Sequence, residues 1–83
     1  MERTWYVYIL RCADETLYTG VTTDVARRVN EHNDSLRAAK YTRVRRPVML
    51  VRTEPFQTRS EACIREAAIK KLTREEKLDL VSS

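Results

Sequence analysis

The stretch TWYVYILRCADETLYTGVT, residues 4–22, decides the fold. Its first part, residues 4–12, alternates in polarity and is rich in β-branched and aromatic residues, which is typical of a strand. The polar residues 13–16 predict a turn, and residues 17–22 predict a second strand. Two strands joined by so short a loop are expected to form an antiparallel hairpin. Gly20, the single glycine of the chain, lies in the second of these strands.

The residues after this hairpin predict a helix and a third strand. Asp24 is suited to cap a helix that runs to about Asn33, with Val25, Ala26 and Val29 as its apolar stripe. Residues 48–56 predict the third strand, and Pro55 marks its end.

Two capping boxes of the form S/T-x-x-E predict two further helices. Thr58 with Glu61 predicts a helix from about residue 59, and Thr73 with Glu76 predicts a short last helix. The expected fold is therefore α+β, with the order β-β-α-β-α-α: a three-stranded antiparallel sheet flanked by helices.

The size and composition of the chain indicate one small globular domain over residues 1–83, with 42% hydrophobic and 34% charged residues. We find neither a signal peptide nor an apolar run long enough to cross a bilayer, so we expect a cytoplasmic protein without membrane contacts. Cys12 and Cys63 lack CxxC spacing, which argues against structural zinc, and we expect both thiols to be buried.

The net charge is +4, and residues 37–46 hold five basic residues and no acidic one. Charge of one sign on a short loop attracts polyanions, chiefly nucleic acid. A merely solvated loop explains the same pattern, and the charge alone leaves the two interpretations equal.

Five chemically versatile side chains are candidates for one surface. Tyr8 and Tyr18 would be neighbours in the hairpin, and Arg28 with His32 follows on the first helix, while Glu66 lies on a later one. Each also has a structural explanation. The tyrosines can be packing residues, Arg28 can pair with Glu31 or Asp24, His32 can face the carbonyl end of its helix, and Glu66 can pair with Lys70.

Taken together, the order of these residues resembles the GIY-YIG nuclease superfamily. Y-V-Y at 6–8, Y-T-G at 18–20 and R-x-x-x-H at 28–32 precede a distant glutamate. With A-K-Y-T-R at 39–43 and R-R-P-V at 45–48, the chain is similar to the small stand-alone bacterial proteins of the UPF0213 (YhbQ) type. The similarity extends from Trp5 to about Val81.

The resemblance implies an endonuclease that cleaves phosphodiester bonds with one Mg²⁺ or Mn²⁺ ion, weakly bound without substrate and held by Glu66. Tyr8 would be the base or its partner, with a phenol pKa lowered by Arg28 and the metal. Tyr18 would position phosphate or water, Arg28 would hold the phosphate and His32 would relay a proton. The residues expected to bind substrate are Gly20, Arg27, Lys40, Tyr41, Arg43, Arg45 and Arg46. Gly20 is expected to let the substrate phosphate approach the backbone.

Two features depart from the family pattern. Tyr6 stands where the first motif has glycine, and no asparagine follows Glu66. The expected partner is nucleic acid, with DNA favoured over RNA, and no protein partner is evident. The alternative is a non-catalytic nucleic-acid-binding module that keeps the nuclease fold.

Overall fold

The computed structural model describes residues 3–82. Its sheet has three strands, β1 (Trp5–Arg11), β2 (Leu17–Thr22) and β3 (Met49–Phe56), in the order β2-β1-β3. Both pairings are antiparallel, so the hairpin predicted from residues 4–22 is confirmed, with Tyr8 opposite Gly20. β2 is therefore an edge strand, and its outer side is free of any neighbouring strand among the described residues.

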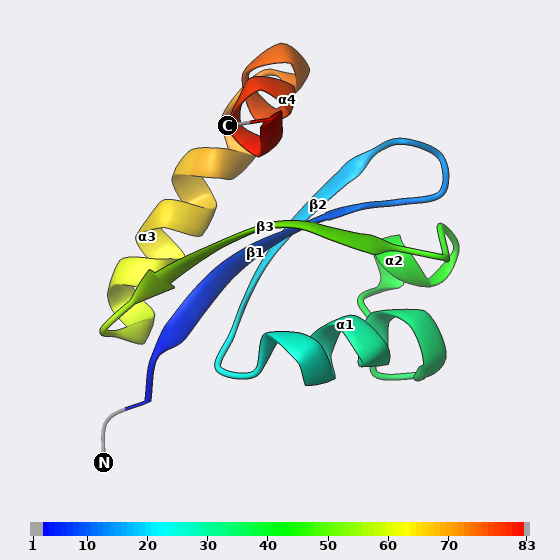
Figure 1. The fold of residues 1–83 in the computed structure, drawn as a ribbon, viewed down its shortest axis with the longest axis horizontal. Helices are drawn as coiled ribbons and strands as arrows, with labels where there is room; N and C mark the ends of the chain where they lie inside the picture. Colours follow the sequence, from blue (N-terminus) through cyan, green and yellow to red (C-terminus); the bar gives the residue numbers. More distant parts are fainter. Residues whose placement is uncertain (1–2, 83) are drawn as a thin grey trace.

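Helices cover both faces of this sheet (Figure 1). α1 (Val25–Asp34) and the short α2 (Lys40–Arg43) lie on one face, and α3 (Arg59–Lys70) with α4 (Arg74–Ser82) lies on the other. The predicted α+β class and element order are confirmed. α2 is additional, because the sequence predicted only a loop there.

The predicted caps begin the helices. The Asp24 carboxylate accepts a hydrogen bond from the Arg27 backbone N–H at 3.1 Å, which starts α1. Thr58 accepts from the Glu61 N–H at 3.2 Å, and Thr73 from the Glu76 N–H at 3.2 Å. Both capping boxes therefore form as the sequence predicts.

The core has two parts, one on each side of the sheet, because alternate residues of β1 point to opposite faces. Val7 and Ile9 pack with Ala62 and Ile69 of α3. Tyr8 and Leu10 pack on the α1 face with Cys12 and Val48.

Three expectations from the sequence were wrong, two about burial and one about secondary structure. Ala26 is exposed, and the buried residue of α1 is His32, because this helix packs a polar side chain rather than an alanine against the sheet. Cys63 is only half-buried, since it borders a pocket. Tyr41, in the segment expected to be a loop, belongs to α2, which buries Thr42. Within residues 3–82 no helix is long and apolar enough to span a membrane.

Candidate active site

A pocket of about 310 Å³ opens at the outer edge of β2. Because β2 has no outer neighbour, the pocket reaches both faces of the sheet and takes side chains from β1, β2, α1 and α3. Four of the five predicted catalytic residues border it, and the complete lining is Trp5, Tyr8, Tyr18, Gly20, Val21, Arg28, Arg59, Cys63 and Glu66. The fold thus brings the phenols, the guanidinium and the carboxylate to one place.

Gly20 provides the seat for the Tyr8 ring. A Cβ at Gly20 would lie 2.5 Å from Tyr8 Cζ and 2.9 Å from Cε1, and closer still to the hydroxyl. These approaches are too short for carbon atoms in contact. The backbone of Gly20 has no positive φ, so conformational freedom does not explain the residue. The sequence predicted that Gly20 makes room for substrate, whereas the nearest group in the structure is the Tyr8 phenol.

The fifth predicted catalytic residue, His32, lies behind this phenol and is fully buried. The Tyr8 hydroxyl is 2.8 Å from His32 Nε2, and His32 Nδ1 is 2.7 Å from the Thr42 hydroxyl oxygen. Thr42 donates its own proton to the Ala39 carbonyl at 3.0 Å. Its oxygen must therefore accept from Nδ1–H, which leaves Nε2 free to accept the Tyr8 proton.

The electrostatic environment agrees with a neutral histidine and a protonated phenol. Burial, with Arg28 and Arg46 nearby, lowers the pKa of His32 to about 4. Burial, followed by the neighbouring Tyr18, raises the pKa of Tyr8 to about 12. The sequence predicted that Arg28 and the metal together lower the pKa of this phenol. Arg28 acts in that direction, but without the metal burial keeps the pKa of Tyr8 raised.

Arg28 supplies fixed positive charge beside Tyr8. Its Nη1 donates to Glu31 Oε1 at 3.2 Å and to the Arg37 carbonyl at 2.9 Å. The pairing with Glu31 that the sequence also allowed is thus present. These contacts hold the head of a half-buried side chain at the pocket.

Glu66 is the single carboxylate among the described residues that border the pocket. One of its oxygens lies 3.4 Å from Lys70 Nζ, so the alternative i,i+4 pair is also present. Across residues 3–82, no group of three or more His, Cys, Asp or Glu side chains is placed to hold a metal ion. A lone carboxylate at a pocket open to solvent fits a hard divalent cation that keeps most of its water ligands.

Sequence reasoning missed Arg59, which brings a second cation to the pocket. Its guanidinium lies over the Trp5 ring, 5.8 Å from the centroid. Arg59, Cys63 and Glu66 follow the 4+3 spacing of one helix face, so the position of Glu66 could have pointed to the other two.

Arg43, Arg45 and Arg46 contact other groups of the protein, chiefly main-chain carbonyls near their own segment. Arg43 donates to the Leu36 carbonyl at 2.8 Å, and Arg46 donates to carbonyl oxygens at the end of α1, those of Glu31, His32 and Ser35. Arg45 lies 3.9 Å above the Tyr41 ring centroid and 3.0 Å from Asp14. Lys40 is exposed. None of these residues borders the 310 Å³ pocket that contains Glu66, which is called the Glu66 pocket below.

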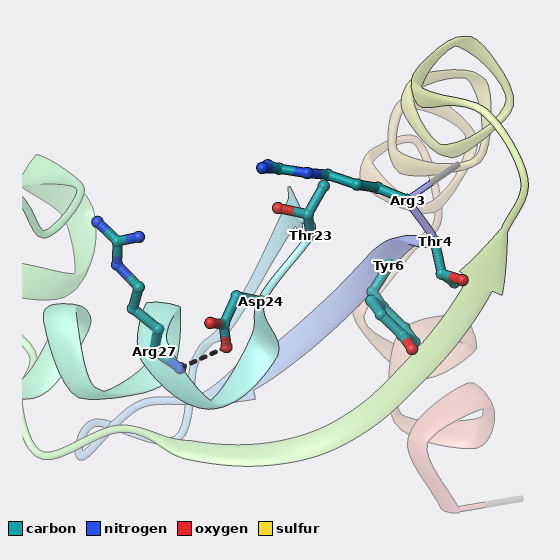
Figure 2. A pocket seen from close by; sticks show the side chains of 6 residues that line it. All are labelled: Arg3, Thr4, Tyr6, Thr23, Asp24 and Arg27. Atoms are coloured by element: carbon teal, nitrogen blue, oxygen red, sulfur yellow. Dashed lines mark hydrogen bonds between the residues drawn. The ribbon is translucent and has the colours of Figure 1, made fainter. Parts of the chain in front are cut away.

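Arg27 also lies apart from the Glu66 pocket. It borders a different pocket, of about 440 Å³, beside the start of α1. Figure 2 shows Asp24 and Arg27 on one side of that pocket and Thr4 and Tyr6 on the other, with the Arg3 side chain extending across toward Thr23. Tyr6, which stands where the first motif has glycine, borders this pocket and does not border the Glu66 pocket.

Comparison with known proteins defines the class to which this fold and pocket belong. Residues 4–79 match the GIY-YIG catalytic domain, and the chain belongs to this family. Within the family it is similar to proteins named UPF0213. One, from Desulfotalea psychrophila, is 58% identical over 95% of this chain and 72% of its own length. Another, from Haloquadratum walsbyi, is 61% identical over 90% of this chain and 83% of its own.

Two solution NMR structures share the fold. The UPF0213 protein of Bacillus halodurans is 49% identical with a TM-score of 0.61, covering 95% of this chain and 83% of that one. A protein from E. faecalis is 47% identical with a TM-score of 0.63, covering 99% and 90%. The resemblance inferred from the sequence is thus confirmed.

Proposed function

We propose that this protein is an endonuclease that hydrolyses phosphodiester bonds of nucleic acid with one bound Mg²⁺ or Mn²⁺ ion. The observation that carries the proposal is one pocket bordered by Tyr8, Tyr18, Arg28 and Glu66, in which the Tyr8 hydroxyl is hydrogen-bonded to a neutral histidine. We further propose that residues 1–83 act as a single domain on DNA in the cytoplasm, without an obligatory protein partner.

The arrangement of the side chains suggests how each one acts. Arg28 and Arg59 bind the non-bridging oxygens of the scissile phosphate and stabilise the charge that develops there. Tyr8 accepts a proton from the attacking water while passing its own proton to His32 Nε2. Because the pKa of His32 is about 4, this transfer is concerted with attack on phosphorus and leaves no long-lived imidazolium. The water oxygen then bonds to phosphorus, and the bond from phosphorus to the leaving oxygen breaks with its electron pair going to that oxygen. The leaving oxygen takes up a proton from solvent water, and His32 returns its proton through Tyr8 to solvent. Tyr18 positions the water or the phosphate.

Glu66 is the residue that would hold the metal ion, with water and substrate phosphate as the remaining ligands. When bound, the ion would supply Lewis-acid stabilisation of the charge on the phosphate and the leaving oxygen.

The test compares wild-type protein with Glu66→Gln on single-stranded, duplex and branched DNA, with Mg²⁺ or Mn²⁺ present. We expect Glu66→Gln to nick at least about 100-fold more slowly, because it loses the metal ligand, which is worth several kcal/mol. The matched control is Glu75→Gln on exposed α4, which should nick like the wild type. Equal nicking by wild type and Glu66→Gln, or none by either, contradicts the proposal.

The second candidate function is nucleic-acid binding without cleavage. It is favoured by a pocket with two arginines and a single carboxylate. In that case wild type and Glu66→Gln both bind DNA in a salt-sensitive manner, and neither nicks it.

A further inference from the structure

A further pocket, of about 200 Å³, lies near the start of β2. It differs from both the Glu66 pocket and the Arg27 pocket and is called the second pocket below. Its lining is Thr16, Leu17, Tyr41, Arg74 and Lys77, so β2, α2 and α4 all contribute to it. The proposed mechanism uses none of these residues, and the sequence predicted a substrate contact for Tyr41 alone among them.

The second pocket and the Glu66 pocket lie side by side, because a lining residue of one contacts a lining residue of the other. Tyr41 borders the second pocket and stacks on Tyr18, which borders the Glu66 pocket, with ring centroids 6.0 Å apart and planes 26° apart. Along the edge of β2, Leu17 and Gly20 are three residues apart, which is about 10 Å of strand. A single nucleic-acid strand lying along this edge would therefore reach both pockets with nucleotides that are close together in sequence.

The lining of the second pocket combines two kinds of chemistry. Leu17 and Tyr41 offer apolar and aromatic surface, and Tyr41 as a residue is 37% exposed. Arg45 lies over the Tyr41 ring and Tyr18 stacks on it, so the aromatic surface offered to the pocket is chiefly the ring edge.

Arg74 and Lys77 offer positive charge, and no carboxylate is among the described lining residues. Arg74 donates one hydrogen bond, at 3.1 Å, to the Glu15 carbonyl, which fixes α4 against the β1–β2 turn. Aromatic surface beside cations is the combination that binds a nucleobase together with its phosphate.

We propose that this pocket binds a nucleotide one or two positions from the cleaved bond, with its base against Tyr41 and Leu17 and its phosphate against Arg74 and Lys77. This inference rests on the proposed function, because it places the cleaved bond in the Glu66 pocket. It assigns α4 a part in substrate binding. It also gives Tyr41 a contact with a base rather than with the scissile phosphate.

The experiment measures binding without cleavage, so that failure of the nuclease proposal does not obscure it. All variants carry Glu66→Gln, and a fluorescent single-stranded 12-mer DNA is titrated in the absence of metal. We expect Lys77→Gln to weaken binding several-fold and to reduce the salt slope by about one phosphate contact. The matched control is Lys71→Gln, the same charge change at the exposed C-cap of α3, which should bind as the parent does.

A second series tests the base contact. We expect Tyr41→Leu to bind about tenfold more weakly, since the aromatic surface that the base contacts is lost, while Tyr41→Trp keeps most of the affinity. Moving one abasic site along the 12-mer should reveal a position at which the parent and Tyr41→Leu bind equally. Circular dichroism of each variant shows that it is folded.

The inference is overturned if Lys77→Gln and Lys71→Gln change binding equally, or if no abasic position abolishes the difference between the parent and Tyr41→Leu. Nicking that persists in the Glu66-containing protein while these binding effects are missing refutes the second pocket alone. Binding effects as expected without any nicking refute the nuclease proposal and leave the second pocket as a nucleotide site.

Discussion

The Tyr8 phenol connects the solvent-facing pocket with a buried polar chain. Its ring rests against the backbone of Gly20, and its hydroxyl reaches His32. His32 in turn reaches Thr42, whose hydroxyl donates to the Ala39 carbonyl. Each buried polar side-chain atom in this series from Tyr8 to Thr42 has a hydrogen-bond partner. The orientation of the phenol is therefore set by groups that substrate does not contact.

Gly20→Ala should displace the Tyr8 ring. The added Cβ overlaps a phenol that is buried on its other side, so we expect a loss of about 1–3 kcal/mol in the free energy of unfolding. Nicking should fall with it. Urea denaturation measures the stability change. In the Tyr8→Leu background the same Gly20→Ala change should cost much less, and an equal cost in both backgrounds would show that the ring is not the obstacle.

Thr42→Val should weaken the proton relay while keeping the shape of the core. Without the hydroxyl, His32 Nδ1–H loses its acceptor, and the tautomer with Nε2 unprotonated is no longer favoured. We expect nicking to slow by about 10–100-fold, with a changed pH–rate profile, and ¹⁵N NMR to report the imidazole tautomer. Thr42→Ser should restore both. A rate defect that Thr42→Ser does not repair would indicate packing rather than positioning.

Buried His32 should also make stability depend on pH. Its pKa is near 6.5 in the unfolded chain and about 4 in the folded protein, so between these values the unfolded state binds the additional proton. Stability is therefore retained above pH 6.5 and lost as the pH falls toward 4, by up to about 3 kcal/mol. Urea titrations of wild type and His32→Asn from pH 7.5 to 4 measure the difference. Parallel curves for the two proteins would contradict the assignment.

At the scale of elements, the segment from α1 to β3 is held by hydrogen bonds to main-chain carbonyls. The end of α1 has its orphan carbonyls satisfied by the Arg46 guanidinium. Asn33 exchanges two hydrogen bonds with the Val48 backbone, at 2.8 and 3.1 Å. These contacts hold the two ends of the segment that contains α2.

Replacing Arg46 tests whether it is structural. Arg46→Gln should lower the free energy of unfolding by about 1–3 kcal/mol, because several partly buried carbonyls lose a charged donor. Arg37→Gln, at an exposed position of the same basic segment, should cost less than about 0.5 kcal/mol. Thermal or urea unfolding decides. If the two variants are equally stable, Arg46 is not needed for the fold, and the substrate-binding role that the sequence predicted for it is favoured.

At the scale of the whole molecule, the net charge of +4 overstates the charge available to nucleic acid. Several arginines of residues 37–46 are engaged within the fold, and the cations at the two pockets along β2 are Arg28, Arg59, Arg74 and Lys77. Nucleic-acid binding should therefore depend on a few charges at one edge of the sheet rather than on the basic segment as a unit.

This view predicts a modest dependence on salt. With about three or four phosphates neutralised, the logarithm of single-strand affinity should fall with the logarithm of salt concentration at a slope of roughly −2 to −3. Fluorescence anisotropy from 50 to 300 mM NaCl measures it. A slope near zero would exclude phosphate contacts. A slope steeper than about −5 would indicate that the arginines and lysine of residues 37–46 also contact phosphates.

Much of this protein follows from local patterns. Alternation of residue types, one Asx cap and two capping boxes predicted the strands and the main helices, since each depends on residues close together in the chain. The order of the tyrosines, Arg28, His32 and Glu66 was enough to indicate the family, which the match over residues 4–79 confirms.

What only the tertiary structure decided depends on residues far apart in the chain. The seat of Tyr8 on Gly20, the tautomer of His32, the entry of Arg59 into the pocket and the use of Arg46 as a helix cap all arise from packing across elements. Burial also raises the pKa of Tyr8 in the metal-free protein and outweighs Arg28, because the cost of desolvating a charge is set by the surrounding fold and not by neighbours in the sequence.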